Sequence, residues 1–180
     1  MLKYSNTIKE WVKNFIIESN AIENIGIGLR YDRAPNEEEI EEAFRFIGLD
    51  SISIEELEQF ILIYQPKNSY DGKQTRLRNK KGLNVSVGNY QAPKGGAGIK
   101  RKLEDLLDEI NGDPISESTN NPFLAHKEYE SLHPFTDCNG RTGRIIWLWQ
   151  MLKLKKNFAP AGFLVTWYYN SLNESRKYGK

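Results

Sequence analysis

The spacing of apolar residues predicts a mostly helical protein. Near the N-terminus these residues recur at intervals typical of an amphipathic helix: Ile8, Trp11, Val12, Phe15 and Ile16. Similar periods predict further helices at about 36–47, 53–64, 99–110, 122–132 and 140–154. A last helix is expected to hold Trp167, Tyr168 and Leu172.

Local residue signals place the ends of several helices. Pro35–Asn36 begins the second helix and Gly48 ends it. Ser53 and Glu56 have the spacing of a capping box at the start of the third helix. Pro122 suits the first position of the helix that follows it. The apolar face of that helix is expected to contain Leu124, Ala125, Tyr129 and Leu132.

The stretch 65–98 lacks a helical period and is rich in Lys, Asn and Gly. Apolar and polar residues alternate along Leu83–Val87, and Lys81–Gly82 could turn the chain. We therefore expect a small β-hairpin at about 76–87. The length of 180 residues and the 39% hydrophobic content indicate one domain and exclude a disordered tail, a collagen-like fibre or a coiled coil. The expected fold class is mainly α, a helical bundle with one hairpin.

Cysteine content and hydropathy bear on the compartment. Cys138 is the single cysteine, so the chain forms no internal disulfide and the reducing cytoplasm is the expected location. The longest apolar runs, such as Phe60–Tyr64, fall far short of the ~20 residues that cross a bilayer. The segment Met1–Ser5 lacks the apolar core of a signal peptide. No membrane association is expected.

Charge is balanced overall and uneven along the chain. The net charge is +1, yet nine acidic residues and one Arg lie at 36–58, and ten basic residues and one Asp lie at 67–102. These segments are either two solvated faces or a basic strip that meets an anionic partner. Nucleic-acid binding ranks last, because Tyr70 and Tyr90 are the only aromatic residues in the strip.

The densest group of chemistry-bearing residues lies at 133–144, just before the apolar run of the 140–154 helix. A helix N-terminus binds anions through its unpaired N–H groups and its dipole. Arg141 and Arg144 are three positions apart and project from one side of the first turn, so they could hold several phosphates. The sequence therefore predicts a polyphosphate site here.

Three neighbouring side chains add catalytic possibilities. Asp137 could hold a divalent cation, Asn139 could donate from its amide to a phosphate, and His133 can take a proton near neutral pH. Each residue alone has a structural interpretation as a turn or surface residue. Together within twelve positions they suit transfer of part of a nucleotide to a hydroxyl.

The segment 133–144, His-Pro-Phe-Thr-Asp-Cys-Asn-Gly-Arg-Thr-Gly-Arg, resembles the Fic signature His-Pro-Phe-x-Asp/Glu-Gly-Asn-Gly-Arg-x-x-Arg. The resemblance extends to 125–130, the helix that leads into the motif, and to the flap at 76–93. It also includes 167–172, the helix that closes the nucleotide site. It implies a single Fic domain over 1–180, with an N-terminal inhibitory helix within 1–30.

The resemblance implies a protein adenylyltransferase that moves AMP from ATP, with Mg²⁺, to a Tyr, Ser or Thr hydroxyl of a target protein or of the enzyme itself. His133 would be the general base, Asp137 the metal ligand and Phe135 a core anchor. The nucleotide would contact Asp137, Cys138, Asn139, Gly140, Arg141, Arg144, Tyr168 and Tyr169.

One position departs from the signature. Cys138 stands where the family usually has Gly, and a side chain there would cost on the order of 1–2 kcal/mol if the turn needs a positive φ. Its thiol is either an inert filler or a reactive group. Gly140 keeps the pattern of the AMP-transferring members, because the Doc-like branch, which resembles a kinase, usually has Lys there.

A second, shorter resemblance lies upstream. Residues 19–24, Ser-Asn-Ala-Ile-Glu-Asn, resemble the inhibitory motif Ser/Thr-x-x-x-Glu-Gly/Asn of the class with an N-terminal inhibitory helix. We expect Glu23 to pair with Arg144 and so to block the guanidinium that the γ-phosphate needs. Ser19 would fix the segment by a hydrogen bond, and Asn24 completes the motif.

Several alternatives remain open at this stage. The same scaffold could remove AMP from a target, or transfer another nucleotide or phosphate-containing group. It could also be a catalytically weak nucleotide-binding module, with Cys138 as the cause. A homo-oligomer is possible, and the sequence names no target.

Overall fold

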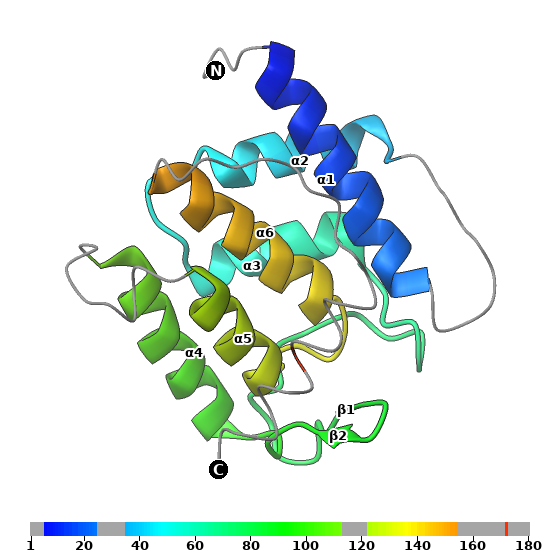
Figure 1. Cartoon of the computed structure of the whole chain (residues 1–180). Coiled ribbons are helices and arrows are strands. Elements are labelled where there is room, and N and C mark those ends of the chain that lie inside the picture. The colour runs from blue at the N-terminus through cyan, green and yellow to red at the C-terminus, as the bar shows by residue number, and fades with distance from the viewer. Residues whose placement is uncertain (1–5, 25–34, 113–121, 155–171, 173–180) are drawn as a thin grey trace.

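The computed structural model describes residues 6–24, 35–112, 122–154 and 172 (Figure 1). Its helices are α1 (Asn6–Asn24), α2 (Glu37–Ile47), α3 (Ile54–Tyr64), α4 (Ala97–Asn111), α5 (Pro122–Leu132) and α6 (Asn139–Lys153). Its strands are β1 (Ser86–Val87) and β2 (Tyr90–Gln91), which pair antiparallel. The expected mainly helical fold with one small hairpin is confirmed.

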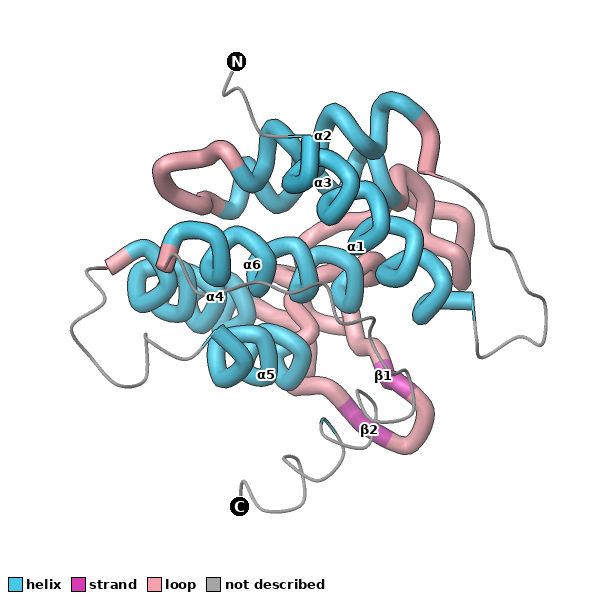
Figure 2. The backbone as a smooth tube through the Cα atoms, turned by 45° about the horizontal axis from the view of Figure 1, so that its top comes forward, coloured by secondary structure: helices cyan, strands magenta, loops and turns pink. Residues whose placement is uncertain are grey.

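Helix α6 is the centre of the bundle. Figure 1 and Figure 2 both show it between α1, α2 and α3 on one side and α4 and α5 on the other. It has no single apolar stripe, because neighbours cover it on several sides and most of its residues are buried. Trp149 is 1% exposed, and its indole N–H donates to the carbonyl of Leu49 at 2.8 Å. The C-terminal half of α6 is thereby held within the core.

The caps of α2 and α3 correct one sequence expectation. A complete capping box forms on α2, where Asn36 and Glu39 exchange side-chain and backbone bonds. On α3, Ser53 accepts from the backbone N–H of Glu56 as expected. The Glu56 carboxylate pairs with Arg45 of α2 instead of completing the box. An ion pair between two helices replaces the reciprocal bond.

The predicted hairpin turn was in the wrong place. The strands pair Ser86 with Gln91 and Val87 with Tyr90, so the turn lies after Val87, at Gly88 with φ 56°. A glycine at positive φ suits such a two-residue connection. The Lys81–Gly82 segment makes a separate turn before the strands.

The chain that leads into the hairpin is joined to the loop before α6. Leu77 pairs with Phe135 in an isolated antiparallel bridge. The backbone N–H of Thr136 donates to the carbonyl of Arg76 at 2.9 Å. The hairpin is therefore anchored directly beside the residues 133–144.

The exposed fractions along α5 correct one more expectation. Leu124 is 38% exposed, so its expected place on the inner face of α5 was wrong, whereas Tyr129 is fully buried.

Among the described residues, none of the helices combines the length and apolar character that crossing a bilayer requires.

The close approach of α5 to α6 depends on Gly143. A Cβ added there would lie 2.5 Å from Oε1 of Glu130 and 3.0 Å from Cδ1 of Tyr129. We predict that Gly143→Ala lowers the free energy of unfolding by about 2 kcal/mol, because both neighbours are buried and must shift. The difference in the free energy of unfolding between the variant and the parent is measured by urea denaturation. The control is Gly98→Ala in α4, where a Cβ meets nothing within 4 Å. That change should stabilise the helix slightly, and equal effects of the two variants would contradict the packing argument.

Candidate active site

The loop before α6 has an unusual backbone. Among the described residues, His133 (φ 49°) and Cys138 (φ 65°) are the non-glycine residues with positive φ. Phe135 between them is completely buried. Strained positions of this kind concentrate at functional sites. The loop is therefore a candidate functional site.

Asn139 holds the loop closed. Its Oδ1 accepts from the N–H of Phe135 at 2.9 Å, and its Nδ2 donates to the carbonyl of the same residue at 2.8 Å. The side chain is 2% exposed. The amide therefore shapes the loop, and because Nδ2 has a second N–H, its expected bond to a phosphate stays a prediction.

Asp137 is held by a residue that the sequence did not point to. Its Oδ2 accepts from the backbone N–H and the hydroxyl of Ser69, at 2.6 and 2.7 Å, and its Oδ1 accepts from the N–H of Cys138 at 2.6 Å. A carboxylate has about four acceptor positions, so one position on Oδ1 is left. That suits a single bond to Mg²⁺, which takes one or two carboxylates and completes its shell with phosphate oxygens and water.

Arg144 meets the end of α1. The guanidinium is 1% exposed, and its Nε donates to the hydroxyl of Ser19 at 2.8 Å. Its Nη2 donates to the Ser19 carbonyl at 2.9 Å and pairs with Oε1 of Glu23 at 2.5 Å. Ser19 and Glu23 lie one helical turn apart and so reach the same group. The expected contact between Glu23 and Arg144 is confirmed, and Asn24 is the last residue of α1.

Gly140 makes room for this pair. A Cβ at this position would collide with Oε1 of Glu23 and would lie 3.0 Å from Nη1 of Arg144. The carboxylate therefore rests against the first turn of α6, where the helix dipole is positive. No side chain caps α6 at Cys138, so Glu23 supplies negative charge at this end.

Arg141 turns away from Arg144. Its Nη1 donates to the carbonyl of Tyr64 at 2.9 Å, and its Nη2 donates to Oε1 of Gln65 at 2.5 Å. These groups form the C-terminal end of α3, where a cation is favourable. The two arginines, expected to act together on phosphates, thus rest on two different helices.

Comparison with known proteins decides the family. Residues 49–151 match the family model described as Fic/DOC family. The chain belongs to the Fic/DOC family. The matched range contains the flap, α5, the 133–138 loop and most of α6, and it leaves out α1. Members of this family are typically transferases that act on ATP and modify target proteins.

A solved structure shows the same fold. It is that of Fic-1 from C. elegans, amino acids 134 to 508, with one Glu-to-Gly substitution; the sequence identity is 21% and the TM-score is 0.59. The match covers 97% of this chain and 59% of that chain. This protein therefore spans about three fifths of the Fic-1 chain. A comparison with curated protein sequences found no significant match to this chain.

The histidine of the Fic signature lies close to a carboxylate. Nδ1 of His133 is 4.0 Å from Oε2 of Glu130, one turn earlier in α5. Both side chains are largely buried. This separation is too long for a hydrogen bond, so Glu130 acts on the imidazole through its charge. Glu130 was not singled out from the sequence, although its spacing from His133 was a possible signal.

Cys138, the departure from the Fic signature, adopts the left-handed conformation that the usual Gly would favour. Burial raises the pKa of its thiol to about 11, and the side chain is 3% exposed. The thiol is therefore protonated at neutral pH, which favours the inert filler over the reactive group.

The nucleotide contacts expected from Tyr168 and Tyr169 lie outside the described residues. Leu172, from the same segment, is buried.

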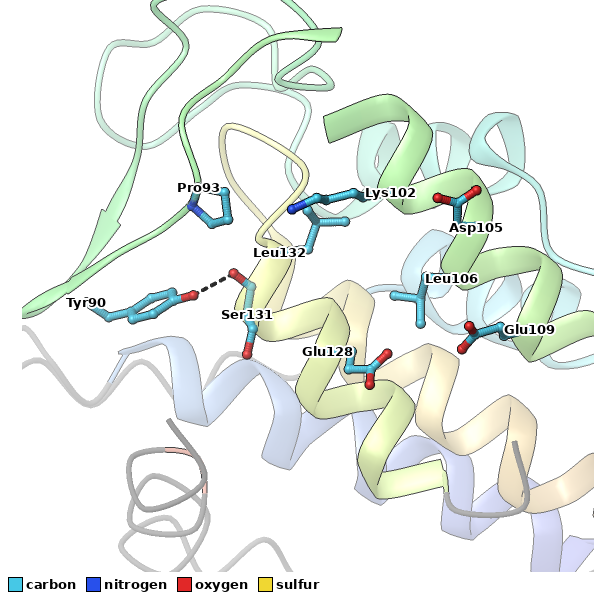
Figure 3. A pocket seen from close by; sticks show the side chains of 9 residues that line it. All are labelled: Tyr90, Pro93, Lys102, Asp105, Leu106, Glu109, Glu128, Ser131 and Leu132. Carbon is cyan, nitrogen blue, oxygen red and sulfur yellow. Dashed lines mark hydrogen bonds between the residues drawn. The ribbon is translucent and has the colours of Figure 1, made fainter. Parts of the chain in front are cut away.

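A cavity of about 360 Å³ lies between the segment 76–93, the expected flap, and helices α4 and α5 (Figure 3). Tyr90 and Pro93 line it from the flap, and the hydroxyl of Tyr90 donates to the carbonyl of Ser131 at 2.7 Å. None of the described residues that line it belongs to 133–144 or to α1. The cavity is thus distinct from the site around Arg144, and the Tyr90 bond fixes the flap to the end of α5.

The strain at Cys138 leads to a prediction. Cys138→Gly relieves the left-handed backbone but loses a buried side chain and gains freedom in the unfolded chain, so its net effect should be small. Cys138→Val should lower the free energy of unfolding by about 2 kcal/mol relative to Cys138→Gly, because a β-branched residue is poorly tolerated at positive φ. Urea denaturation gives the free energies of unfolding of the two variants for comparison. Equal midpoints would show that this backbone position carries no strain.

His126 in α5 gives a pH dependence. Burial, reinforced by the charge of Arg144, lowers its pKa from 6.5 to about 4. The unfolded chain binds this proton first, so stability is complete above pH 6.5 and falls as the pH drops towards 4. Unfolding at pH 5 should be easier than at pH 7 by about 2 kcal/mol from this residue. His126→Gln should flatten that slope, and an unchanged slope would remove His126 as its source.

Proposed function

We propose that this Fic domain transfers AMP from ATP to a hydroxyl of a protein target. One observation carries the proposal: in a member of the Fic/DOC family, a histidine, a carboxylate with a remaining acceptor position and a buried guanidinium surround the N-terminus of one helix, which no side chain of its own caps. These are His133, Asp137 and Arg144. The arrangement supports binding of a triphosphate beside a general base.

The proposed step is a displacement at the α-phosphorus. The target oxygen forms a bond to that phosphorus, the bond to the bridging oxygen of the β-phosphate breaks, and pyrophosphate leaves. Nε2 of His133 takes the hydroxyl proton, and Glu130 stabilises the resulting imidazolium. The backbone of the first turn of α6 and Arg144 would balance the charge of the phosphates.

Asp137 would hold Mg²⁺ through its remaining acceptor position, while Ser69 keeps the carboxylate in place. When bound, the ion would neutralise phosphate charge. Among the described residues there is no group of three or more His, Cys, Asp or Glu side chains that could form an all-protein metal cage. A site of one carboxylate completed by phosphates agrees with that finding.

We further propose that α1 is an inhibitory helix. Glu23 and a γ-phosphate would compete for the same guanidinium, and Ser19 keeps that guanidinium turned towards α1. ATP would then bind only in a pose that does not react. The target is a protein hydroxyl, and one available target is the enzyme itself.

Removal of the Glu23 carboxylate tests the proposal. We predict that Glu23→Gly increases incorporation of label from α-labelled ATP into the protein roughly tenfold or more, because a charge-assisted hydrogen bond is worth about 1.5–3 kcal/mol. Labelled protein is counted after electrophoresis. The matched control is Glu10→Gly, an exposed position of the same helix, which weakens α1 without touching Arg144.

The outcomes separate the two parts of the proposal. Equal and nonzero labelling of the parent, Glu10→Gly and Glu23→Gly would remove the brake and leave the transfer. Absence of label from all three would remove the transfer itself.

A second variant tests the base. In the Glu23→Gly background, His133→Ala should abolish labelling, while ATP binding measured by calorimetry is kept. Labelling at the undiminished rate would show that His133 is not the base.

A further inference from the structure

A buried arginine outside the Fic signature links the flap to the site. Arg78 is completely buried, and burial lowers its pKa. Among the described residues no carboxylate pairs with it, and each of its side-chain hydrogen bonds ends on a backbone carbonyl. A buried cation is costly unless its donors are satisfied, so this network is a specific structural feature rather than a chance contact.

Two of these carbonyls belong to the end of α5. Nη2 of Arg78 donates to Leu132 at 2.8 Å, and Nε donates to His133 at 2.6 Å. The backbone N–H of Arg78 continues the series by donating to Pro134 at 2.8 Å. The last carbonyls of a helix lack partners within it. Arg78 therefore caps α5 where His133 leaves the helix with positive φ.

The same guanidinium holds both arms of the flap. Its Nη1 donates to the carbonyl of Leu83 at 3.2 Å on one arm and to that of Pro93 at 2.8 Å on the other. Because a guanidinium is planar and rigid, one group fixes both arms relative to His133. Tyr90 adds a second link, to the carbonyl of Ser131.

We propose that Arg78 is a positioning residue that holds the flap and His133 in one geometry for transfer. The proposal rests on the proposed function. Among the described residues, the Arg78 side chain donates to the carbonyls of Leu83, Pro93, Leu132 and His133 and makes no hydrogen bond to Asp137 or Arg144, which would bind the nucleotide. A change at Arg78 should therefore slow the transfer and leave nucleotide binding in place.

The test uses the Glu23→Gly protein and the variant Arg78→Lys. Lys keeps the charge but has at most three donors on a single nitrogen, so it cannot reproduce the fork. The matched control is Arg76→Lys, two residues away, whose side chain donates only to the carbonyl of Gln74 among the described residues. The rate of automodification is measured against ATP concentration with α-labelled ATP, and ATP–Mg²⁺ binding is measured by calorimetry.

We expect Arg78→Lys to lower the maximal rate at least roughly tenfold, the loss of about one hydrogen bond to a charged group. The KM for ATP and the calorimetric affinity and stoichiometry should stay unchanged, and Arg76→Lys should match its parent. A purely structural role would lower the binding stoichiometry together with the rate. That result, or an unchanged maximal rate, would overturn the proposal. Failure of the Glu23→Gly parent to label would instead count against the proposed function.

Tyr90→Phe provides a second measurement that leaves the buried cation intact. It removes only the hydroxyl that donates to Ser131 and should lower the maximal rate less than Arg78→Lys, again with the KM for ATP unchanged. If Arg78→Lys fails to fold, this variant decides: a maximal rate equal to that of the parent would overturn the inference that the flap must be fixed to the end of α5.

Discussion

The site depends on one physical constraint, the need to satisfy a buried guanidinium at the corner between α5 and α6. Arg78 has no exposed surface, and within the part of the chain that the structure describes its side chain donates to backbone carbonyls alone. Desolvation of a charge costs several kcal/mol, and hydrogen bonds to a charged group contribute about 1.5–3 kcal/mol each. The bonds can offset that cost only if both flap arms and the end of α5 stay in place. A single charge thus makes three segments of chain interdependent.

The N-terminus of α6 beside this corner has no side-chain cap of its own. Cys138 begins α6 without a side-chain cap, Asn139 is occupied with the loop, and Gly140 has no side chain. The positive end of the helix dipole is then available to whichever negative group approaches. In this structure that group is Glu23, which also reaches Arg144. One carboxylate satisfies two positive features that a triphosphate would also satisfy.

The sequence predicted what is local or periodic. The helices followed from apolar spacing, and the Glu23–Arg144 contact followed from two short motifs with opposite charges. The turn of the flap was missed, because residues 65–98 carry several Gly and Asn that suit turns equally well. The contacts of Ser69 with Asp137 and of Arg78 with α5 join residues more than fifty positions apart. Neither a period nor a motif encodes such pairs, so only the folded chain could place them.

The exposed fractions of Glu23 and Arg144 show how a phosphate could replace the carboxylate in their ion pair. The Arg144 side chain is 1% exposed, whereas that of Glu23 is 36% exposed, so water and incoming solutes reach the carboxylate first. If a phosphate replaces the carboxylate, one anion succeeds another on a cation that is never left buried and unpaired. The carboxylate is therefore both a competitor for nucleotide and a support for the fold. Its loss removes one anionic partner of Arg144 while both Ser19 oxygens stay in place, and a bound triphosphate should then stabilise the folded chain more than it does when Glu23 is present.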